Sequence, residues 1–185
     1  MNKLHFLHTF FKPEKFNIEE IQIILTQFEK VELKKNDFLI EKGQVANYYF
    51  LLEFGFLRSY VLDLTGNNIT TNFFTKRDII IDWDSYYHNK KCKESIQAIT
   101  NCRCWKISLS KAIKLSAIDS FQEVNRMVLV KNHLELKNHL DLVISNSAKQ
   151  RYLKLVKEKP ILVKNVPLKH IATYLGITDT SLSRI

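Results

Sequence analysis

Residues 34–74 decide the fold, and they read KKNDFLIEKGQVANYYFLLEFGFLRSYVLDLTGNNITTNFF. Short runs rich in aromatic and β-branched residues alternate here with turn-forming residues around Gly43, Gly55 and Gly66. Runs of the same kind continue throughout residues 31–108, and no long helical segment separates them. Many short strands at this spacing predict an antiparallel sandwich or barrel, such as a double-sheet jelly roll.

Helical patterns flank the strand region. Residues 17–28 begin with an asparagine cap and an acidic first turn, and their apolar residues recur at helical spacing. After the strands, the pattern predicts a short helix beginning over residues 110–116, a long helix over 121–144 and a further helix over 148–159. We therefore predict an α+β fold.

The long helix carries a wide apolar stripe, formed by Val130, Leu134, Leu136, Leu140 and Val143. A helix this apolar on one side needs a partner, and a second copy of the chain would supply one. Packing against the chain's own strands is the alternative, and both can hold along one helix. We expect the stripe to join two copies.

Residues 166–185, which read VPLKHIATYLGITDTSLSRI, have the spacing of a helix-turn-helix. Ile171 and Leu175 share one face of a first helix, and Gly176 supplies the left-handed turn that ends it. Thr178 is placed to cap a second helix. The alternative is an ordinary helix pair at the end of a domain.

The predicted second helix starts at Asp179. Leu182 and Ile185 are expected to point inward, which leaves Thr180 and Arg184 on the outward face, together with Ser183, and Ser181 at its margin. Small hydroxyls and an arginine suit a groove that presents base edges and phosphates.

The net charge of +9 is concentrated in the C-terminal part of the chain. Residues 1–110 hold 15 Lys and Arg against 13 Asp and Glu, whereas residues 111–185 hold 13 against 6. Between residues 149 and 169 only Glu158 opposes seven basic residues. A basic segment beside a helix-turn-helix favours a phosphate backbone as partner over a merely solvated face.

Other classes of site find little support. Three cysteines, Cys92, Cys102 and Cys104, make no regular disulfide or cluster framework. We expect no catalytic site, no metal site and no cofactor. No stretch predicts a membrane span or a signal peptide, so we expect a cytoplasmic protein without a membrane partner.

The order of these elements resembles the Crp/Fnr family of bacterial transcription regulators. The resemblance is carried by residues 34–74, by AKQRYLKLV at 148–156 and by IATYLGITDTSLSRI at 171–185. It implies a homodimer joined along the long helix, a palindromic operator in double-stranded DNA, and RNA polymerase as a further partner. Its implied parts are a cyclic-nucleotide-binding-like sensor roll over 1–120, a dimerisation helix over 121–145 and a winged helix-turn-helix domain over 146–185.

The same resemblance implies the residues that face DNA. Thr178 caps the recognition helix, and Lys169 and His170 are expected to contact the DNA backbone. Arg184 can bind a guanine or a phosphate. The remaining expected DNA-facing residues are Asp179, Thr180 and Ser181.

The expected effector pocket departs from the pattern of the cyclic-nucleotide-binding members. Ile81 and Asp82 stand where that pattern has Gly-Glu, and Glu94 and Ser95 stand where it has Arg-Ser. A carboxylate in place of a phosphate-binding cation repels the cyclic phosphate. We therefore expect an effector of another kind, or a roll that serves only as a rigid dimer-forming body.

Two other functions stay open. The chain could be a ligand-binding or dimerisation module that acts through protein partners, or a cupin-like enzyme. We also expect an incomplete DNA-binding motif, because the sequence ends about two turns into the recognition helix.

Overall fold

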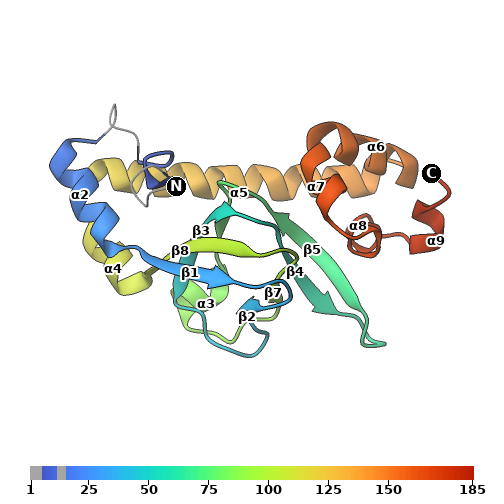
Figure 1. Ribbon diagram of the computed structural model, residues 1–185, viewed down its shortest axis with the longest axis horizontal. Coiled ribbons are helices and arrows are strands. Elements are labelled where there is room, and N and C mark those ends of the chain that lie inside the picture. Colours follow the sequence, from blue (N-terminus) through green and yellow to red (C-terminus); the bar gives the residue numbers. More distant parts are fainter. Residues whose placement is uncertain (1–5, 12–15) are drawn as a thin grey trace.

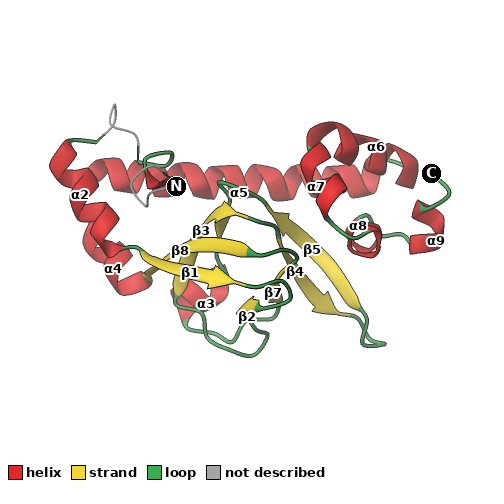
Figure 2. Ribbon diagram, viewed as in Figure 1, coloured by secondary structure: helices red, strands yellow, loops and turns green. Residues whose placement is uncertain are grey.

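The computed structural model describes residues 6–11 and 16–185, and its strands form two antiparallel four-stranded sheets (Figure 2). The sheet orders are β1-β8-β3-β6 and β2-β7-β4-β5, which is a jelly-roll arrangement. The bounds of the strands are β1 Glu29–Leu33, β2 Phe38–Ile40, β3 Tyr48–Phe54, β4 Leu57–Leu62, β5 Asn68–Phe74, β6 Ile79–Ile80, β7 Ser95–Ala98 and β8 Cys102–Ser108.

Apolar side chains fill the space between the sheets, with Leu52, Leu57, Ile80 and Cys104 fully buried there. The predicted runs of aromatic and branched residues all form strands. The two-residue strand β6 was not predicted, because a pair of isoleucines carries no periodicity.

Helices lie at both ends of the roll and along one side of it (Figure 1). Their bounds are α2 Ile18–Gln27, α3 Trp83–His88, α4 Leu109–Leu115, α5 Asp119–Ser145, α6 Ala148–Glu158, α7 Pro160–Asn165, α8 Leu168–Tyr174 and α9 Asp179–Leu182. The predicted α+β class is confirmed, and α7 is an addition, since Pro160 ends the preceding helix and begins a new one.

The helix α2 begins with the predicted cap. The Asn17 side chain accepts a hydrogen bond from the Glu20 amide at 2.7 Å, and the Glu20 carboxylate accepts one from the Asn17 amide. Aromatic rings then join this end of the roll to the start of α5, where Phe11 stacks on Phe121 at 5.8 Å between ring centroids. The N-terminal helices and the roll therefore share a core.

The long helix α5 runs from this aromatic cluster to the C-terminal helices, which gather at its other end (Figure 1). Its 27 residues correspond to a length of about 40 Å. Lys131 pairs with Asp78 at 3.3 Å and so ties the middle of the helix to the roll. Of the residues in α5, Phe121 is the one that is fully buried.

The C-terminal helices do not have a core of their own. The cluster that holds α6 to α9 together also contains Phe73 of β5 and Ile99, which follows β7. The helices therefore pack on the roll, and this docking was not predicted. Among the described residues, no helix is both long and apolar enough to span a bilayer.

We expect Gly55→Ala to destabilise the roll more than Gly66→Ala. Both glycines have positive φ, +97° and +87°, so both substitutions carry a backbone cost of roughly 1–2 kcal/mol. A Cβ at position 55 would also lie 2.5 Å from the Asn101 carbonyl oxygen, whereas position 66 is open. Urea denaturation measures both, and equal losses would contradict this account of Gly55.

Candidate nucleic-acid interface

The predicted helix-turn-helix is formed by α8 and α9. Helix α8 gives way at Gly176, which takes φ +68°, a left-handed conformation that glycine adopts without steric cost. The Thr178 hydroxyl then accepts a hydrogen bond from the Ser181 amide at 3.1 Å and caps α9. Ile171 and Leu182 are buried in the core that the two helices share.

The end of α9 differs from the prediction. Leu182 points inward as expected, but Ile185 is 40% exposed. The helix ends at Leu182, so helical spacing does not carry Ile185 to the same face. Leu182 alone of this pair contributes to the core.

The outward face of α9 is open. Asp179, Thr180, Ser181 and Arg184 are all exposed. The Ser181 hydroxyl is engaged with that of Thr178 at 2.8 Å, whereas the side chains of Thr180 and Arg184 have no hydrogen-bond partner within the described part of the chain. These two side chains are therefore free to contact a ligand.

Lys169 and His170, predicted together as DNA contacts, point to different surroundings. Lys169 is exposed, whereas His170 is half-buried against the roll. The Nδ1 atom of His170 lies 2.9 Å from a guanidinium nitrogen of Arg58 on β4. The imidazole of His170 is therefore held by the roll, whereas the Lys169 ammonium is open to solvent.

Side chains of α8 make further contacts with β5. The Thr173 hydroxyl accepts a hydrogen bond from the Thr70 amide at 3.2 Å and donates one to the Thr70 hydroxyl at 3.1 Å. The ring of Tyr174 lies between those of Phe73 at 5.0 Å and His139 at 4.6 Å. Helix α8 is thus fixed to the roll and, through His139, to α5.

Arg58 is the unusual member of this contact. It is 3% exposed, and no carboxylate among the described residues pairs with it. Its guanidinium lies over the ring of Tyr60 and donates to Thr70 at 3.4 Å and to Gln97 at 3.3 Å. No sequence pattern singles out this arginine, although its strand β4 lies between β7 and β5 in the sheet.

The imidazole of His170 is held in its neutral form. A guanidinium has only donors, so the Nδ1 atom of His170 must accept from Arg58. Burial, together with the positive charges of Arg58 and Lys169, lowers the pKa of His170 to about 4.

Basic side chains surround the C-terminal helices. Arg151 is half-buried and donates to the Asn146 carbonyl at 2.8 Å, and Lys154 lies 3.9 Å from Glu158. The other basic residues of α6 to α8 have no ion pair in the described structure and are exposed, apart from the half-buried Lys159; they are Lys149, Lys157, Lys159, Lys164 and Lys169.

A cavity of about 570 Å³ lies between the roll, α5 and the C-terminal helices. Three of the four predicted effector-pocket residues line it, namely Ile81, Asp82 and Glu94. The fourth, Ser95, does not; it is buried, and its hydroxyl accepts a hydrogen bond from the Lys42 amide at 3.0 Å. Residues of α6 and α8, including Tyr174, also line the cavity. Their contribution was not predicted, because it depends on how the C-terminal helices dock on the roll.

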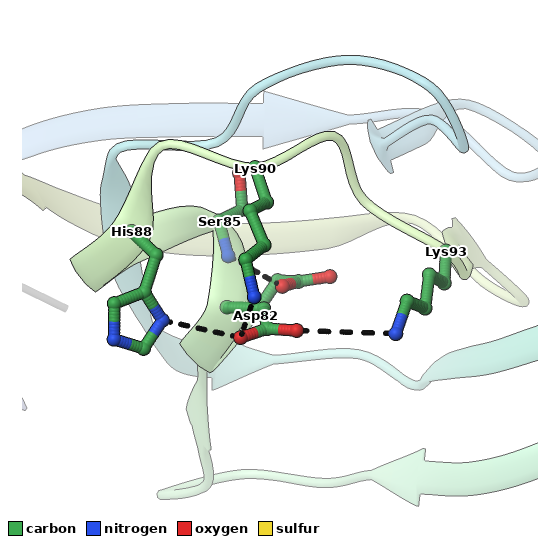
Figure 3. A network of polar contacts seen from close by, with 6 residues as sticks. Asp82, Ser85, His88, Lys90 and Lys93 are labelled. Carbon is green, nitrogen blue, oxygen red and sulfur yellow. Dashed lines mark hydrogen bonds and ion pairs between the residues drawn. The ribbon is translucent and has the colours of Figure 1, made fainter.

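The two aspartates beside Trp83 have separate roles (Figure 3). Asp82 caps α3 by accepting from the Ser85 amide at 2.9 Å. Asp84 lies within the helix, and hydrogen bonds from His88 and Lys90, together with the charges of Lys90 and Lys93, lower its pKa. The distances to its carboxylate are 3.1 Å from His88, 3.4 Å from Lys90 and 3.9 Å from Lys93.

The three cysteines are buried and unpaired. Burial raises the pKa of Cys104 to about 12, so its thiol stays protonated and unreactive. No group of three or more metal-ligating side chains occurs among residues 6–11 and 16–185.

We expect the stability of the folded chain to fall as the pH decreases from about 6.5 to about 4. In this window the unfolded chain protonates His170, whose ordinary pKa is 6.5, while the folded chain keeps it neutral. His170→Gln should make the dependence shallower, although His139, whose pKa burial also lowers, keeps part of it. Denaturation at several pH values measures the slope.

His133→Gln serves as the control, because this histidine is exposed on α5. It should leave the slope unchanged. An equal slope in the wild type and in His170→Gln would contradict the assigned role of His170.

Comparison with known proteins identifies the fold. The profile of the family described as the cyclic nucleotide-binding domain matches residues 30–119, and no curated protein sequence matches the chain. FixK2 from Bradyrhizobium japonicum superposes with a TM-score of 0.70 at 19% identity, covering 85% of this chain and 81% of FixK2.

Two further solved structures agree. A putative Crp/Fnr regulator from Eubacterium rectale has a TM-score of 0.70 at 16% identity, covering 95% of this chain and 85% of that one. The c-di-GMP-responsive regulator CLP of Xanthomonas campestris has a TM-score of 0.69 at 11% identity, covering 91% of this chain and 89% of CLP. Residues 30–119 thus match the family model of the cyclic nucleotide-binding domain, and the chain has the fold of the solved Crp/Fnr transcriptional regulators.

Proposed function

We propose that the chain is a sequence-specific DNA-binding transcription regulator of the Crp/Fnr type. The observation that carries this proposal is the exposed face of α9, held in place by a glycine turn, a threonine cap and a buried core. The proposed parts are a sensor roll over residues 1–120, a dimerisation helix over 121–145 and a DNA-binding domain over 146–185.

The charge of the C-terminal helices supports DNA as the partner. Lys149, Lys157, Lys164 and Lys169 are exposed and without a carboxylate partner in the described structure. Such cations attract phosphates over long range and release bound counterions when they meet them. Arg184 and Thr180, free on α9, would read base edges or fix the helix on the backbone.

The exposed stripe of α5 supports a homodimer. Val130, Leu134, Leu136, Leu140 and Val143 are each at least 41% exposed, although Leu136 also borders the cavity. A second copy packed along α5 would cover this surface and present two α9 helices to one duplex. Successive major grooves on one side of DNA lie about 34–36 Å apart, so the dimer geometry sets the operator spacing.

The proposed effector of the roll is not a cyclic nucleotide. Asp82 and Glu94 line the cavity where that ligand class needs a cation for its phosphate. The effector acts only through a difference in affinity between arrangements that bind DNA well and badly.

We expect Arg184→Ala to weaken specific DNA binding by about tenfold or more, because an arginine paired with a base or phosphate contributes roughly 1–3 kcal/mol. If Arg184 meets a phosphate, the slope of log affinity against log salt should also fall by about one. Fluorescence anisotropy on duplexes selected from a random-sequence pool, at several salt concentrations, measures both.

Lys114→Ala is the matched control. This exposed lysine lies on α4, at the opposite end of α5 from the C-terminal helices (Figure 1). It should leave affinity and slope unchanged. Failure to select any duplex, or an equal loss of DNA affinity in Arg184→Ala and Lys114→Ala, would contradict the assigned interface.

We expect Leu134→Glu to convert the dimer into a monomer. Leu134 is 51% exposed on α5, and a carboxylate there would be desolvated at the contact between two copies. Sedimentation velocity measures the state of association. Leu64→Glu, a change of the same kind at an exposed turn, should stay dimeric, and a dimeric Leu134→Glu would place the interface elsewhere.

A further inference from the structure

The cavity between the roll and the C-terminal helices has the size of a small-molecule site. Its volume of about 570 Å³ lies within the usual range of about 300–1,000 Å³. Three parts of the chain build its walls: strands of the roll, the middle of α5, and residues of α6 and α8. A molecule bound in it would therefore contact the roll and the proposed DNA-binding domain at once.

The roll contributes a pre-arranged set of hydrogen-bond acceptors. The hydroxyls of Ser59 and Thr71 are 2.8 Å apart, and Thr71 donates to the Oε2 atom of Glu94 at 2.9 Å. These hydrogen bonds fix the Glu94 carboxylate, and its Oε1 atom has no hydrogen-bond partner among the described residues. Ser59 is buried, so the first hydroxyl of this hydrogen-bonded series is held in place.

Asp82 adds a second fixed carboxylate. Its Oδ1 atom accepts from the Ser85 amide at the start of α3 (Figure 3), and its side chain also contacts the Cys92 thiol. Within the described residues, no lysine, arginine or histidine lies within 4 Å of either carboxylate. Both carboxylates line the same cavity, and neither has a counter-ion.

The other charged groups of the cavity do not supply a counter-ion for Asp82 or Glu94. Asp78 and Glu135 are both within ion-pair distance of Lys131, and Lys154 faces Glu158 at 3.9 Å. Lys159 is the remaining lysine of the lining, and it follows the end of α6, so it comes from the C-terminal helices and not from the roll. The roll side of the cavity is therefore negative.

Apolar and aromatic side chains make up much of the remaining lining. Phe73, Ile81 and Trp83 come from the roll, Leu136 from α5 and Tyr174 from α8. Aromatic faces beside carboxylates suit a cation with an apolar body, because the cation gains from both.

We propose that this cavity binds an organic amine, with the ammonium group on Asp82 and Glu94 and an aromatic-sized apolar body toward Leu136 and Tyr174. Because α8 forms part of the wall, the bound amine favours the docked position of the C-terminal helices. Binding itself is independent of DNA recognition, whereas the role of the amine as an effector rests on the proposed function.

Calorimetry with three probes of one shape tests the proposal: tryptamine, the neutral tryptophol and the anionic indole-3-propionate. We expect tryptamine to bind the full chain and to bind at least about tenfold more tightly than the other two, since hydrogen bonds to charged groups are the stronger class. Equal affinity for all three, or no binding of tryptamine, would overturn the proposal.

Conservative variants locate the site. Glu94→Gln and Asp82→Asn keep the acceptors for Thr71 and for the Ser85 amide but remove the charge, and each should weaken tryptamine binding by about tenfold. Glu41→Gln, at an exposed carboxylate outside the cavity, should bind as the wild type does. Unchanged binding in both cavity variants would overturn the assignment, once thermal melts show that they are folded.

Hydrogen exchange tests the coupling to the C-terminal helices. Tryptamine should slow exchange of the α8 amides in the wild type and have no effect in Glu94→Gln at the same concentration. Binding without protection of α8 would overturn the coupling. Neither measurement contains DNA, so a failure here is distinct from a failure to bind operator duplexes.

Discussion

The packing of α8 on β5 is the contact on which the rest of the C-terminal part depends. Ile171, Ala172 and Leu175 are fully buried in a cluster that includes Phe73 of the roll. Four short helices with so few residues could not bury a sufficient core alone. Their position, the orientation of α9 and the cavity behind α8 all follow from this shared core.

The docking contact combines an apolar centre with a polar side that is less favourable. Arg58 is almost fully buried without a carboxylate, and its Nε atom has no hydrogen-bond partner. Desolvation of an unpaired cation opposes docking, and the neutral His170 and the ring of Tyr60 compensate only in part. The interface is thus stabilised by apolar burial and weakened at one defined place.

Much of the fold could be predicted because local patterns determine it. Strand periodicity, the Asn17 cap, Gly176 and Thr178 act over a few residues, and each acts where predicted. Docking could not be predicted in this way. The bonds between Thr70 and Thr173 join residues 103 positions apart, and neither threonine stands out in the sequence. The contacts of His170 with Arg58 and of Ser95 with Lys42 could not be predicted for the same reason, because a distant part of the chain supplies each partner.

The continuity of α5 has a mechanical consequence. The helix has no glycine or proline between its aromatic anchor at Phe121 and its end at Ser145, so it transmits rotation as a stiff lever arm. Over its length of about 40 Å, a tilt of about 5° at the anchored end displaces the far end by about 3.5 Å. Ångström-scale repacking around the anchor would thereby displace the far end of α5 by several ångströms.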